Sequence, residues 1–345
     1  MPTPIAILGA SGYAGGELIR LADAHPLLDA VYLGAWRKAG ERLGTVHPQL
    51  DGRDRILESL DVDRVVASGA TLVFLALPHG ASAGPGVELA SRGLRVVDLG
   101  SDFRLDTPER YLTAYGTAHP HPEQLGEWAY GIPELFADDI MAGDRVAVPG
   151  CYPTSGALAL APLVAEGLVE ERGIVVDSLS GVSGAGRGVS EGLQFGVVDE
   201  SVKAYKVLDH RHQPEMERVL DAVGGASAQV LFTPHLVPMQ RGLLSTCYAR
   251  AAWDLSPADL ERCLAATYRD APFVDLIEVP PETRWVVGSN RCLIWVGLDH
   301  RSGTVVVISA IDNLLKGAAG QAVQCANLVL GFPEEIGLPT TGWMP

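Results

Sequence analysis

The sequence lacks several features that mark particular classes of protein. Its longest uninterrupted apolar run, Leu72 to Leu77, is far shorter than the ~20 residues of a membrane-crossing helix. It also lacks a surplus of basic residues, because its formal net charge is −16. Nucleic-acid phosphates bind to clustered cations, so this charge argues against a nucleic-acid partner. We therefore expect neither a membrane nor a nucleic acid as partner.

Paired cysteines are missing as well. The five cysteines, at positions 151, 247, 263, 292 and 325, are odd in number and widely spaced, without a C-x-x-C pair. This pattern fits neither a disulfide scaffold nor a zinc site, so we expect no metal. No basic region or cleavage site precedes the first apolar run, so we expect no secretory leader and a cytoplasmic protein.

The length of 345 residues suggests two domains. In the first 150 residues, short apolar runs alternate with helical segments, which is typical of βαβ units and predicts an α/β fold with a Rossmann-type, doubly wound parallel sheet. The strands expected there are Ile5–Leu8, Ala30–Leu33, Leu72–Leu77, Leu94–Val97 and Val146–Val148.

Beyond residue 170 the apolar runs become longer and predict an antiparallel-rich sheet in an α+β domain. The expected strands are Ile174–Leu179, Leu243–Ala252, Cys292–Leu298 and Thr304–Ile311, and Ser256-Pro257 predicts the start of a helix. A last helix, from Leu314 to about Leu330, is expected to pack on the first domain. The predicted limits are residues 1–150 with 314–345 for dinucleotide binding, and residues 151–313 for catalysis and oligomerisation.

A glycine-rich turn follows the first expected strand. Gly9, Gly12 and Gly15 form G-x-x-G-x-x-G before an amphipathic helix, a variant of the dinucleotide fingerprint. Such a turn brings backbone N–H groups and a helix N-terminus close to pyrophosphate. A turn without a ligand is the alternative. The expected cofactor-binding residues here are Gly9, Ser11, Gly12, Tyr13, Ala14 and Gly15.

After the second expected strand, the acidic residue that usually binds the ribose is missing. Arg37 and Lys38 stand there instead, and two cations suit a 2′-phosphate. The pair favours NADP(H) over NAD, with a solvated basic turn as the alternative.

One cysteine lies at a special position. Cys151 follows an apolar run that ends at Pro149-Gly150, and a buried helix is expected to begin at Pro153. Unpaired N–H groups and the helix dipole would favour a thiolate there, which predicts a nucleophile. A small buried hydrophobic residue is the equally weighted alternative.

A thiolate enzyme needs a partner that exchanges protons near neutral pH, and histidine suits this role. His210 and His212 flank Arg211 and are the candidates; a metal-binding pair and ordinary surface histidines are the alternatives. No adjacent cysteine or carboxylate completes a metal site. Other histidines compete for the role: His47, His79, His119, His121 and His235.

Two further loops are candidates for anion binding. Ser180 to Gly188 strings small residues before and after Arg187 and could admit an anion or a flat ring, or act as a hinge. Ser101 and Arg104 follow an expected strand, at the end where ligands bind in open α/β sheets. An ion pair of Arg104 with Asp102 or Asp106 is the alternative.

Eight motifs, in order along nearly the whole chain, resemble those of the N-acetyl-γ-glutamyl-phosphate reductase family, within the aspartate-semialdehyde dehydrogenase-like superfamily. They are G-A-S-G-Y-A-G from Gly9, A-L-P-H-G from Ala76, S-D-F-R from Ser101, P-G-C-Y-P-T from Pro149, S-G-V-S-G-A-G-R from Ser180, H-R-H-x-P-E from His210, T-P-H-L-V-P-M-x-R-G from Thr233 and D-N-L-L-K-G-A-A-G-Q-A from Asp312. Ser155 departs from the family, which usually has Gly or Ala there.

The resemblance implies NADPH-dependent reduction of N-acetylglutamyl phosphate in arginine biosynthesis, with release of inorganic phosphate, by a homodimer or homotetramer. It implies that Cys151 is the nucleophile, that His210 is the acid/base and that Arg104 binds phosphate or carboxylate. The other implied substrate-binding residues are Ser101, Arg187, Tyr205 and His212. Ser183, Gly184 and Asn313 are expected near the nicotinamide, and Leu77 and Pro78 along the cofactor groove.

Three other classes compete with this interpretation. Aspartate-semialdehyde dehydrogenase and the carrier-linked aminoadipyl-phosphate reductase would share the mechanism, but P-G-C-Y-P-T and H-R-H-x-P-E favour the acetylglutamyl branch. Short-chain dehydrogenases need Tyr-x-x-x-Lys, and none of the nine tyrosines has a lysine four residues later. A non-catalytic NADP sensor would not need a thiol at position 151.

Overall fold

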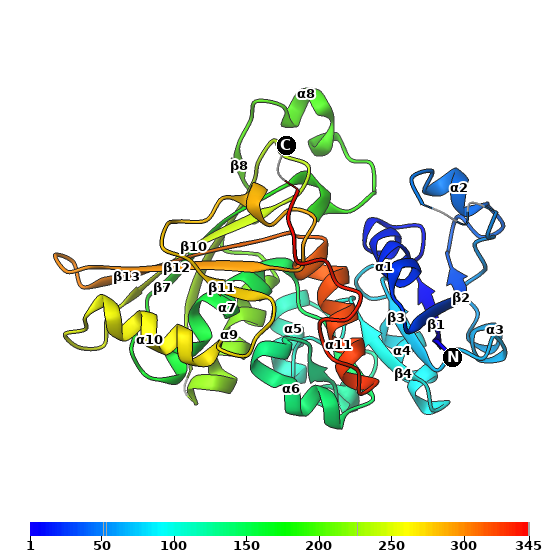
Figure 1. Cartoon of the computed structure of the whole chain (residues 1–345), viewed down its shortest axis with the longest axis horizontal. Coiled ribbons are helices and arrows are strands. Elements are labelled where there is room, and N and C mark those ends of the chain that lie inside the picture. The colour runs from blue at the N-terminus through cyan, green and yellow to red at the C-terminus, as the bar shows by residue number, and fades with distance from the viewer. Residues whose placement is uncertain (51, 53, 226, 344–345) are drawn as a thin grey trace. The chain divides into compact units, whose positions relative to one another are not determined.

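The computed structural model describes residues 1–50, 52, 54–225 and 227–343, which form two compact units (Figure 1). The first comprises Met1–Pro149 and Ala318–Leu338; the second comprises Gly150–Gly317 and the described residues from Pro339 onward. These limits differ from the predicted ones at residue 150, at residues 314–317 and after residue 338. The N–H of Asn290 donates to the carbonyl of Pro339 (2.8 Å), and this bond ties the final segment to the second unit. Residues 344 and 345 of the predicted first domain lie outside the described part.

The first unit is built on a six-stranded sheet in the order β2-β1-β3-β4-β6-β5, and each neighbouring pair is parallel. This confirms the predicted Rossmann-type sheet. Since the strands are parallel, the loops after β1, β2, β3 and β4 leave from the same edge. The strands are β1 (Thr3–Leu8), β2 (Leu28–Gly34), β3 (Leu72–Leu75), β4 (Arg95–Asp98), β5 (Ala129–Tyr130) and β6 (Arg145–Ala147).

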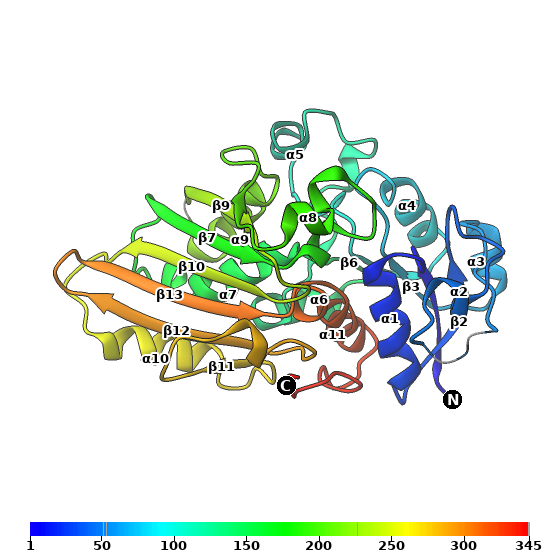
Figure 2. The same cartoon turned by 90° about the horizontal axis from the view of Figure 1, so that it is seen from above.

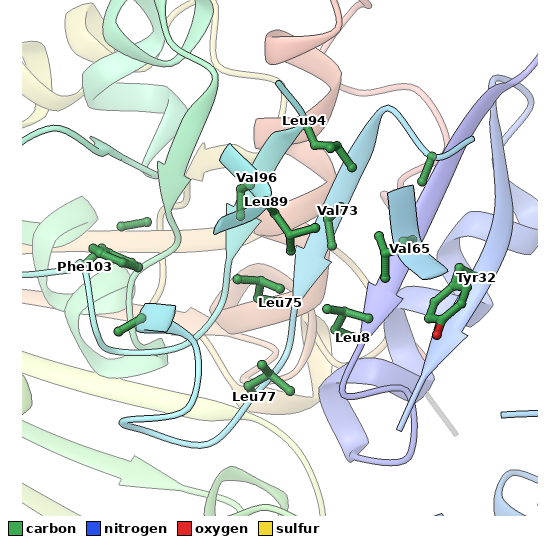
Figure 3. Packing of buried hydrophobic residues seen from close by; sticks show 14 of the residues in the cluster. Leu8, Tyr32, Val65, Val73, Leu75, Leu77, Leu89, Leu94, Val96 and Phe103 are labelled. Carbon is green, nitrogen blue, oxygen red and sulfur yellow. The ribbon is translucent and has the colours of Figure 1, made fainter. Parts of the chain in front are cut away.

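Helices cover both faces of this sheet, which explains why its central strands are apolar throughout. Figure 3 shows one face, where Leu8, Val73 and Leu75 meet Val65 of α3 and Leu89 of α4. Helix α11 contacts α1 and β4. The helices of this unit are α1 (Tyr13–Ala24), α2 (Leu43–Val46), α3 (Val62–Ala67), α4 (Ala83–Ser91), α5 (Pro108–Tyr115), η1 (Pro122–Gln124), α6 (Pro133–Ala142) and α11 (Gly320–Val329).

The second unit holds a seven-stranded mixed sheet in the order β11-β12-β13-β10-β7-β9-β8. Two of its pairs, β7 with β9 and β11 with β12, are parallel, and the other four are antiparallel, which confirms the predicted antiparallel-rich α+β architecture. The strands are β7 (Ile174–Ser180), β8 (Lys203–Ala204), β9 (Val230–Leu236), β10 (Leu243–Arg250), β11 (Val274–Leu276), β12 (Cys292–Asp299) and β13 (Thr304–Ile311).

Three helices pack on one face of this second sheet, as Figures 1 and 2 show: α7 (Cys151–Ala165), α9 (His212–Gly224) and α10 (Pro257–Thr267). The predicted start of α10 is confirmed, since the Asp259 carboxylate accepts from the N–H and the hydroxyl of Ser256 (2.8 and 2.6 Å). The short helices of this unit are η2 (Val182–Ala185), η3 (Glu191–Leu193), α8 (Phe195–Val198) and η4 (Thr283–Trp285).

Two predicted helix boundaries are wrong. Helix α7 begins at Cys151, with Gly150 as its N-cap residue, and not at Pro153. The predicted continuous helix from Leu314 is a π-helix over Leu315–Ala319 that leads into α11. No helix in the described ranges is both long and apolar enough to cross a membrane.

Candidate active site

A pocket of ≈ 450 Å³ in the second unit contains the candidate nucleophile and both candidate histidines. Five residues singled out from the sequence line it: Cys151, Gly184, Tyr205, His210 and His212. The remaining lining residues are Tyr152, Ser180, Gly181, Ala185, Ser190, Gly192, Leu193, Lys203, Lys206, Arg211 and Leu236. Arg187 is exposed and does not line this pocket.

Cys151 is the first residue of α7, a helix of 15 residues, so its thiol lies at the positive end of the helix dipole. The N–H of the preceding Gly150 donates to the buried carboxylate of Glu215 (2.8 Å), which fixes the start of the helix. Gly317 packs against the cysteine so closely that a Cβ there would lie 2.7 Å from the Cys151 Cβ. The backbone on both sides therefore holds the thiol in place.

The other cysteines differ from Cys151 in their surroundings. None of the five is in a disulfide, and Cys247, Cys292 and Cys325 are buried. Burial raises the pKa of Cys247 to about 12 and that of Cys263 to about 11, so these two thiols stay protonated at neutral pH. Only Cys151 stands at a helix N-terminus in a pocket with histidines.

Two tyrosines form one wall of the pocket. The hydroxyl groups of Tyr152 and Tyr205 are 2.9 Å apart, and the His210 ring packs edge-on against both rings, at centroid distances of 5.7 and 5.6 Å. Burial raises the pKa of Tyr205 to about 12 and that of Tyr152 further. Both phenols are therefore neutral at pH 7. Tyr152 directly follows the cysteine but was not among the predicted site residues.

His210 is held neutral by its surroundings. Burial, followed by the positive charges of Lys206 and Arg211, lowers its pKa to about 4. Its Nδ1 faces the N–H of His212 (3.2 Å), so Nδ1 accepts and Nε2 carries the proton in the neutral ring. His212 is the first residue of α9 and is buried, and its ring lies 4.7 Å from that of His210. The pocket thus offers Nε2–H of His210 as a donor.

A hydrogen-bonded junction joins three loops of the second unit. The Oδ1 of Asn313 accepts from the N–H of Gly242 (2.8 Å), and its Nδ2 donates to the hydroxyl of Ser183 (3.0 Å). The adjacent Asp312 is fully buried and pairs with Arg241 (3.1 Å). Sequence analysis placed Ser183 and Asn313 near each other only through the family resemblance, and it missed the Asp312–Arg241 pair.

The glycine-rich loop of the first unit has the close packing that a dinucleotide cradle needs. Gly9 has φ +93°, and a Cβ there would lie 2.2 Å from the Ala76 carbonyl oxygen. A Cβ on Gly15 would lie 2.2 Å from the Gly9 carbonyl oxygen. Buried His47, one of the competing histidines, contacts the carbonyl of Ala10 through Nε2 (2.9 Å) and so supports the loop. The loop therefore fits a dinucleotide phosphate at the start of α1.

The other candidates in the first unit also follow the carboxyl ends of its parallel strands. Arg37 and Lys38 lie exposed after β2, where Lys38 pairs with Glu41 (2.9 Å); Leu77 and Pro78 follow β3. Ser101 and Arg104 follow β4 and are buried. Within the described residues, no group of three or more His, Cys, Asp or Glu is placed to hold a metal ion.

Comparison with known proteins defines the class and then the family. Residues 4–142 match the semialdehyde dehydrogenase NAD-binding domain, and residues 151–313 match the semialdehyde dehydrogenase dimerisation domain. Curated relatives match over almost their full length. The N-acetyl-gamma-glutamyl-phosphate reductase of Syntrophobacter fumaroxidans is 46% identical, with 99% of each chain covered. The protein of the same name from Pelotomaculum thermopropionicum is 43% identical, with 100% of each covered. The chain belongs to the N-acetyl-gamma-glutamyl-phosphate reductase family, and it is an oxidoreductase with an NAD(P)-binding domain.

Solved structures share the fold at low sequence identity. Aspartate semialdehyde dehydrogenase II of Vibrio cholerae, complexed with ASA, superposes with a TM-score of 0.73 at 18% identity, over 96% of this chain and 99% of that one. The Candida albicans aspartate semialdehyde dehydrogenase with NADP gives a TM-score of 0.70 at 17% identity, over 96% and 99% of the two chains. These likenesses confirm the fold class.

Proposed function

We propose that this protein reduces N-acetyl-L-glutamyl 5-phosphate to N-acetyl-L-glutamate 5-semialdehyde and phosphate, with NADPH, in arginine biosynthesis. One observation carries the proposal: the cysteine at the start of α7 shares its pocket with His210, His212 and Tyr205, in a chain 46% identical to a relative named for this reaction. Cys151 is the proposed nucleophile and His210 the proposed acid/base.

The first half of the reaction makes a thioester. The Cys151 thiolate attacks the carbonyl carbon of the acyl phosphate, and a C–S bond forms while the C–O bond to phosphate breaks. The departing phosphate takes the bonding electron pair and one proton. His210 is the proposed acid: its ring takes a proton from solvent and gives one to the departing phosphate through Nε2, so that it ends neutral; neutral Tyr205 and His212 would help to hold the substrate.

The second half reduces the thioester. When bound, the reduced dinucleotide supplies the hydride that adds to the thioester carbon. The resulting oxyanion then re-forms the carbonyl, the C–S bond breaks and the thiolate returns. Over both halves one hydride and one proton are consumed, so the thiolate is regenerated without a further proton. N–H groups at the start of α7 stabilise this thiolate.

The remaining candidate residues have proposed binding roles. The loop from Gly9 to Gly15 would hold the pyrophosphate, and Arg37 with Lys38 would select NADPH through its 2′-phosphate. Ser101 and Arg104 would bind the phosphoryl group or the substrate carboxylate, as would Arg187. Ser183, Gly184 and Asn313 would lie at the nicotinamide, and Leu77 and Pro78 along the cofactor.

We also propose that the chain forms a homodimer or homotetramer in the cytoplasm. The second unit matches a dimerisation domain, and the face of its sheet opposite α7 exposes Leu231 and Tyr248. Free cysteines suit a reducing compartment.

The proposal is tested by running the reaction backwards with purified protein. We expect NADP reduction that requires both N-acetylglutamate semialdehyde and phosphate, with NAD a poorer acceptor. Aspartate semialdehyde serves as the competing substrate. Activity with aspartate semialdehyde but not with the acetylated compound would contradict the proposed substrate, and no activity with either would contradict the reaction.

A further inference from the structure

A second histidine cluster lies in the first unit, where β3 and β4 end. The His79 Nδ1 is 2.7 Å from the Ser101 hydroxyl and 3.1 Å from an oxygen of Asp102. The His79 ring stacks on Tyr115 at 4.2 Å, which fixes its plane. The mechanism above assigns no role to His79 or Asp102.

Asp102 is an anion in this cluster. It is fully buried and accepts hydrogen bonds from the N–H groups of Gly80 (2.7 Å), Ser82 (3.0 Å) and Ala83 (2.9 Å). Burial alone would raise its pKa, but the hydrogen bonds from His79, Gly80 and Ser82 outweigh burial and lower the pKa to about 2. The carboxylate therefore acts only as an acceptor.

The neighbouring carboxyl group of Asp98 shares the Ser82 hydroxyl with Asp102. The Ser82 hydroxyl lies 2.9 Å from Asp98 and 3.0 Å from Asp102, and a hydroxyl has one hydrogen to donate. Since Asp102 is an anion, Ser82 donates to it and accepts from Asp98 whenever Asp98 is protonated. Burial raises the pKa of Asp98 to about 7, in agreement with this arrangement. Asp102, the carboxylate that faces His79, is therefore negatively charged in either state of Asp98.

This charge determines which His79 nitrogen holds hydrogen. A lone pair on Nδ1 would face a carboxylate oxygen 3.1 Å away, so Nδ1 carries a hydrogen whether the ring is neutral or protonated. The Ser101 oxygen, 2.7 Å from that nitrogen, then accepts rather than donates. The hydroxyl hydrogen of Ser101 consequently remains available for another acceptor.

The geometry also excludes an Asp-His-Ser nucleophile. In such a triad the carboxylate and the serine face opposite ring nitrogens, so that the serine can lose its proton to the imidazole. Here both face Nδ1, which is already occupied by hydrogen. His79 acts as a donor to Ser101 and not as its base.

We propose that Asp102 and His79 are positioning residues that turn the hydroxyl hydrogen of Ser101 toward a phosphoryl oxygen of the ligand. An anion is the acceptor that gains most from such a donor, since hydrogen bonds to charged groups are about twice as strong as neutral ones. Ser101 is nearly buried, so water competes weakly for the same hydrogen. The identity of the ligand as a phosphoryl group rests on the proposed function, whereas the protonation of His79 at Nδ1 does not.

Two substitutions distinguish the contribution of the His79 Nδ1–H donor from that of the ring stack on Tyr115. His79→Asn places an amide nitrogen near Nδ1 but removes the stack on Tyr115, whereas His79→Phe keeps the stack and removes the donor. We expect His79→Phe to raise the KM for inorganic phosphate about tenfold in the reverse reaction, with kcat and the Kd for NADP changed less than about threefold. His79→Asn should stay within about threefold of the wild type. His121→Asn, a partly exposed histidine of the same unit, is the matched control and should change nothing.

Each result has a defined meaning. An unchanged phosphate KM in His79→Phe, or equal increases in both variants, would overturn the positioning role. A wild-type protein without phosphate-dependent activity would instead contradict the proposed function. In that case ¹⁵N NMR of His79 still tests the relay: we expect the neutral ring to be protonated at Nδ1, and an Nε2–H tautomer would overturn it.

Discussion

The two histidine clusters of this protein use the same side chain in opposite ways. In the first unit, His79 faces the anion Asp102, so its Nδ1 must donate. In the second unit, His210 faces Lys206 and Arg211, and its Nδ1 accepts from the backbone N–H of His212. The neighbouring charge and one backbone contact thus decide which nitrogen carries hydrogen. The comparison teaches that a histidine's role follows from what faces Nδ1, which the sequence alone does not show.

The largest expected effect comes from replacing Cys151, the proposed nucleophile in the pocket of His210. Cys151→Ser should abolish turnover, because a serine hydroxyl at this position is not ionised at neutral pH and forms no thioester. NADPH affinity, measured by fluorescence titration, should stay within about twofold of the wild type, because the cofactor loop is untouched. Retained turnover would contradict covalent catalysis. Cys263→Ser is the control and should retain full activity.

The second prediction compares the two histidines of the pocket. His210→Asn should lower kcat at least ~10²-fold, the usual range for a proton-transferring group, because Nε2–H is lost. His212→Asn should lower it less, because that residue supplies its backbone N–H in either form. Steady-state kinetics checks both variants. If His212→Asn proves the slower enzyme, the two roles are reversed.

The third prediction concerns cofactor choice in the first unit. Replacing Arg37 and Lys38 together with alanine should raise the KM for NADPH about tenfold, equivalent to ~1.4 kcal/mol, and should leave the KM for NADH unchanged. The physical reason is the loss of the two cations proposed to bind the 2′-phosphate, which NADH does not have. Equal changes in the KM for NADPH and for NADH would show that Arg37 and Lys38 do not recognise the 2′-phosphate.

The smallest expected effect is a change in pH dependence. Because the folded pKa of His210, about 4, lies below its unfolded value of ~6.5, its contribution to the free energy of unfolding is complete above pH ~6.5. That contribution is lost as the pH falls toward 4. Lys206→Met should raise the His210 pKa partway, because burial, the larger cause of the shift, remains. The loss of stability between pH 7 and pH 5 should then be smaller.

Chemical denaturation at both pH values, together with an NMR titration of His210, measures this change. Lys203→Met is the matched control, because Lys203 lines the same pocket but does not contribute to the shift. Equal pKa values in both variants would mean that the charge of Lys206 does not lower the pKa of His210.

Much of the fold was predictable from local patterns. The strand-turn-helix around Gly9 and the strands β1, β2, β12 and β13 follow directly from apolar periodicity. Strand β9 was missed, because Pro234 interrupts its pattern. The proline is tolerated because β9 lies beside the short edge strand β8, which pairs with Leu236 and His235. The π-helix over Leu315–Ala319 has no sequence signature of its own.

The sites were less predictable, because their contacts join distant segments. Arg241 and Asp312 pair across 71 positions, and nothing local to either residue marks the pair. Ser155, the departure from the family pattern, bonds to Ser309 across 154 positions (2.6 Å), so its hydroxyl is satisfied within the core. Sequence motifs predicted the cysteine and the histidines, but only the structure gives the partners of Nδ1 in His79 and His210.

The central claim, that Cys151 carries the acyl group, has one direct test. Mass spectrometry of the intact protein, mixed with N-acetylglutamyl phosphate in the absence of NADPH, should show an added N-acetylglutamyl group. Peptide mapping should place this group on Cys151, and NADPH should remove it. An unmodified Cys151, or an adduct on another residue that NADPH releases, would contradict the account.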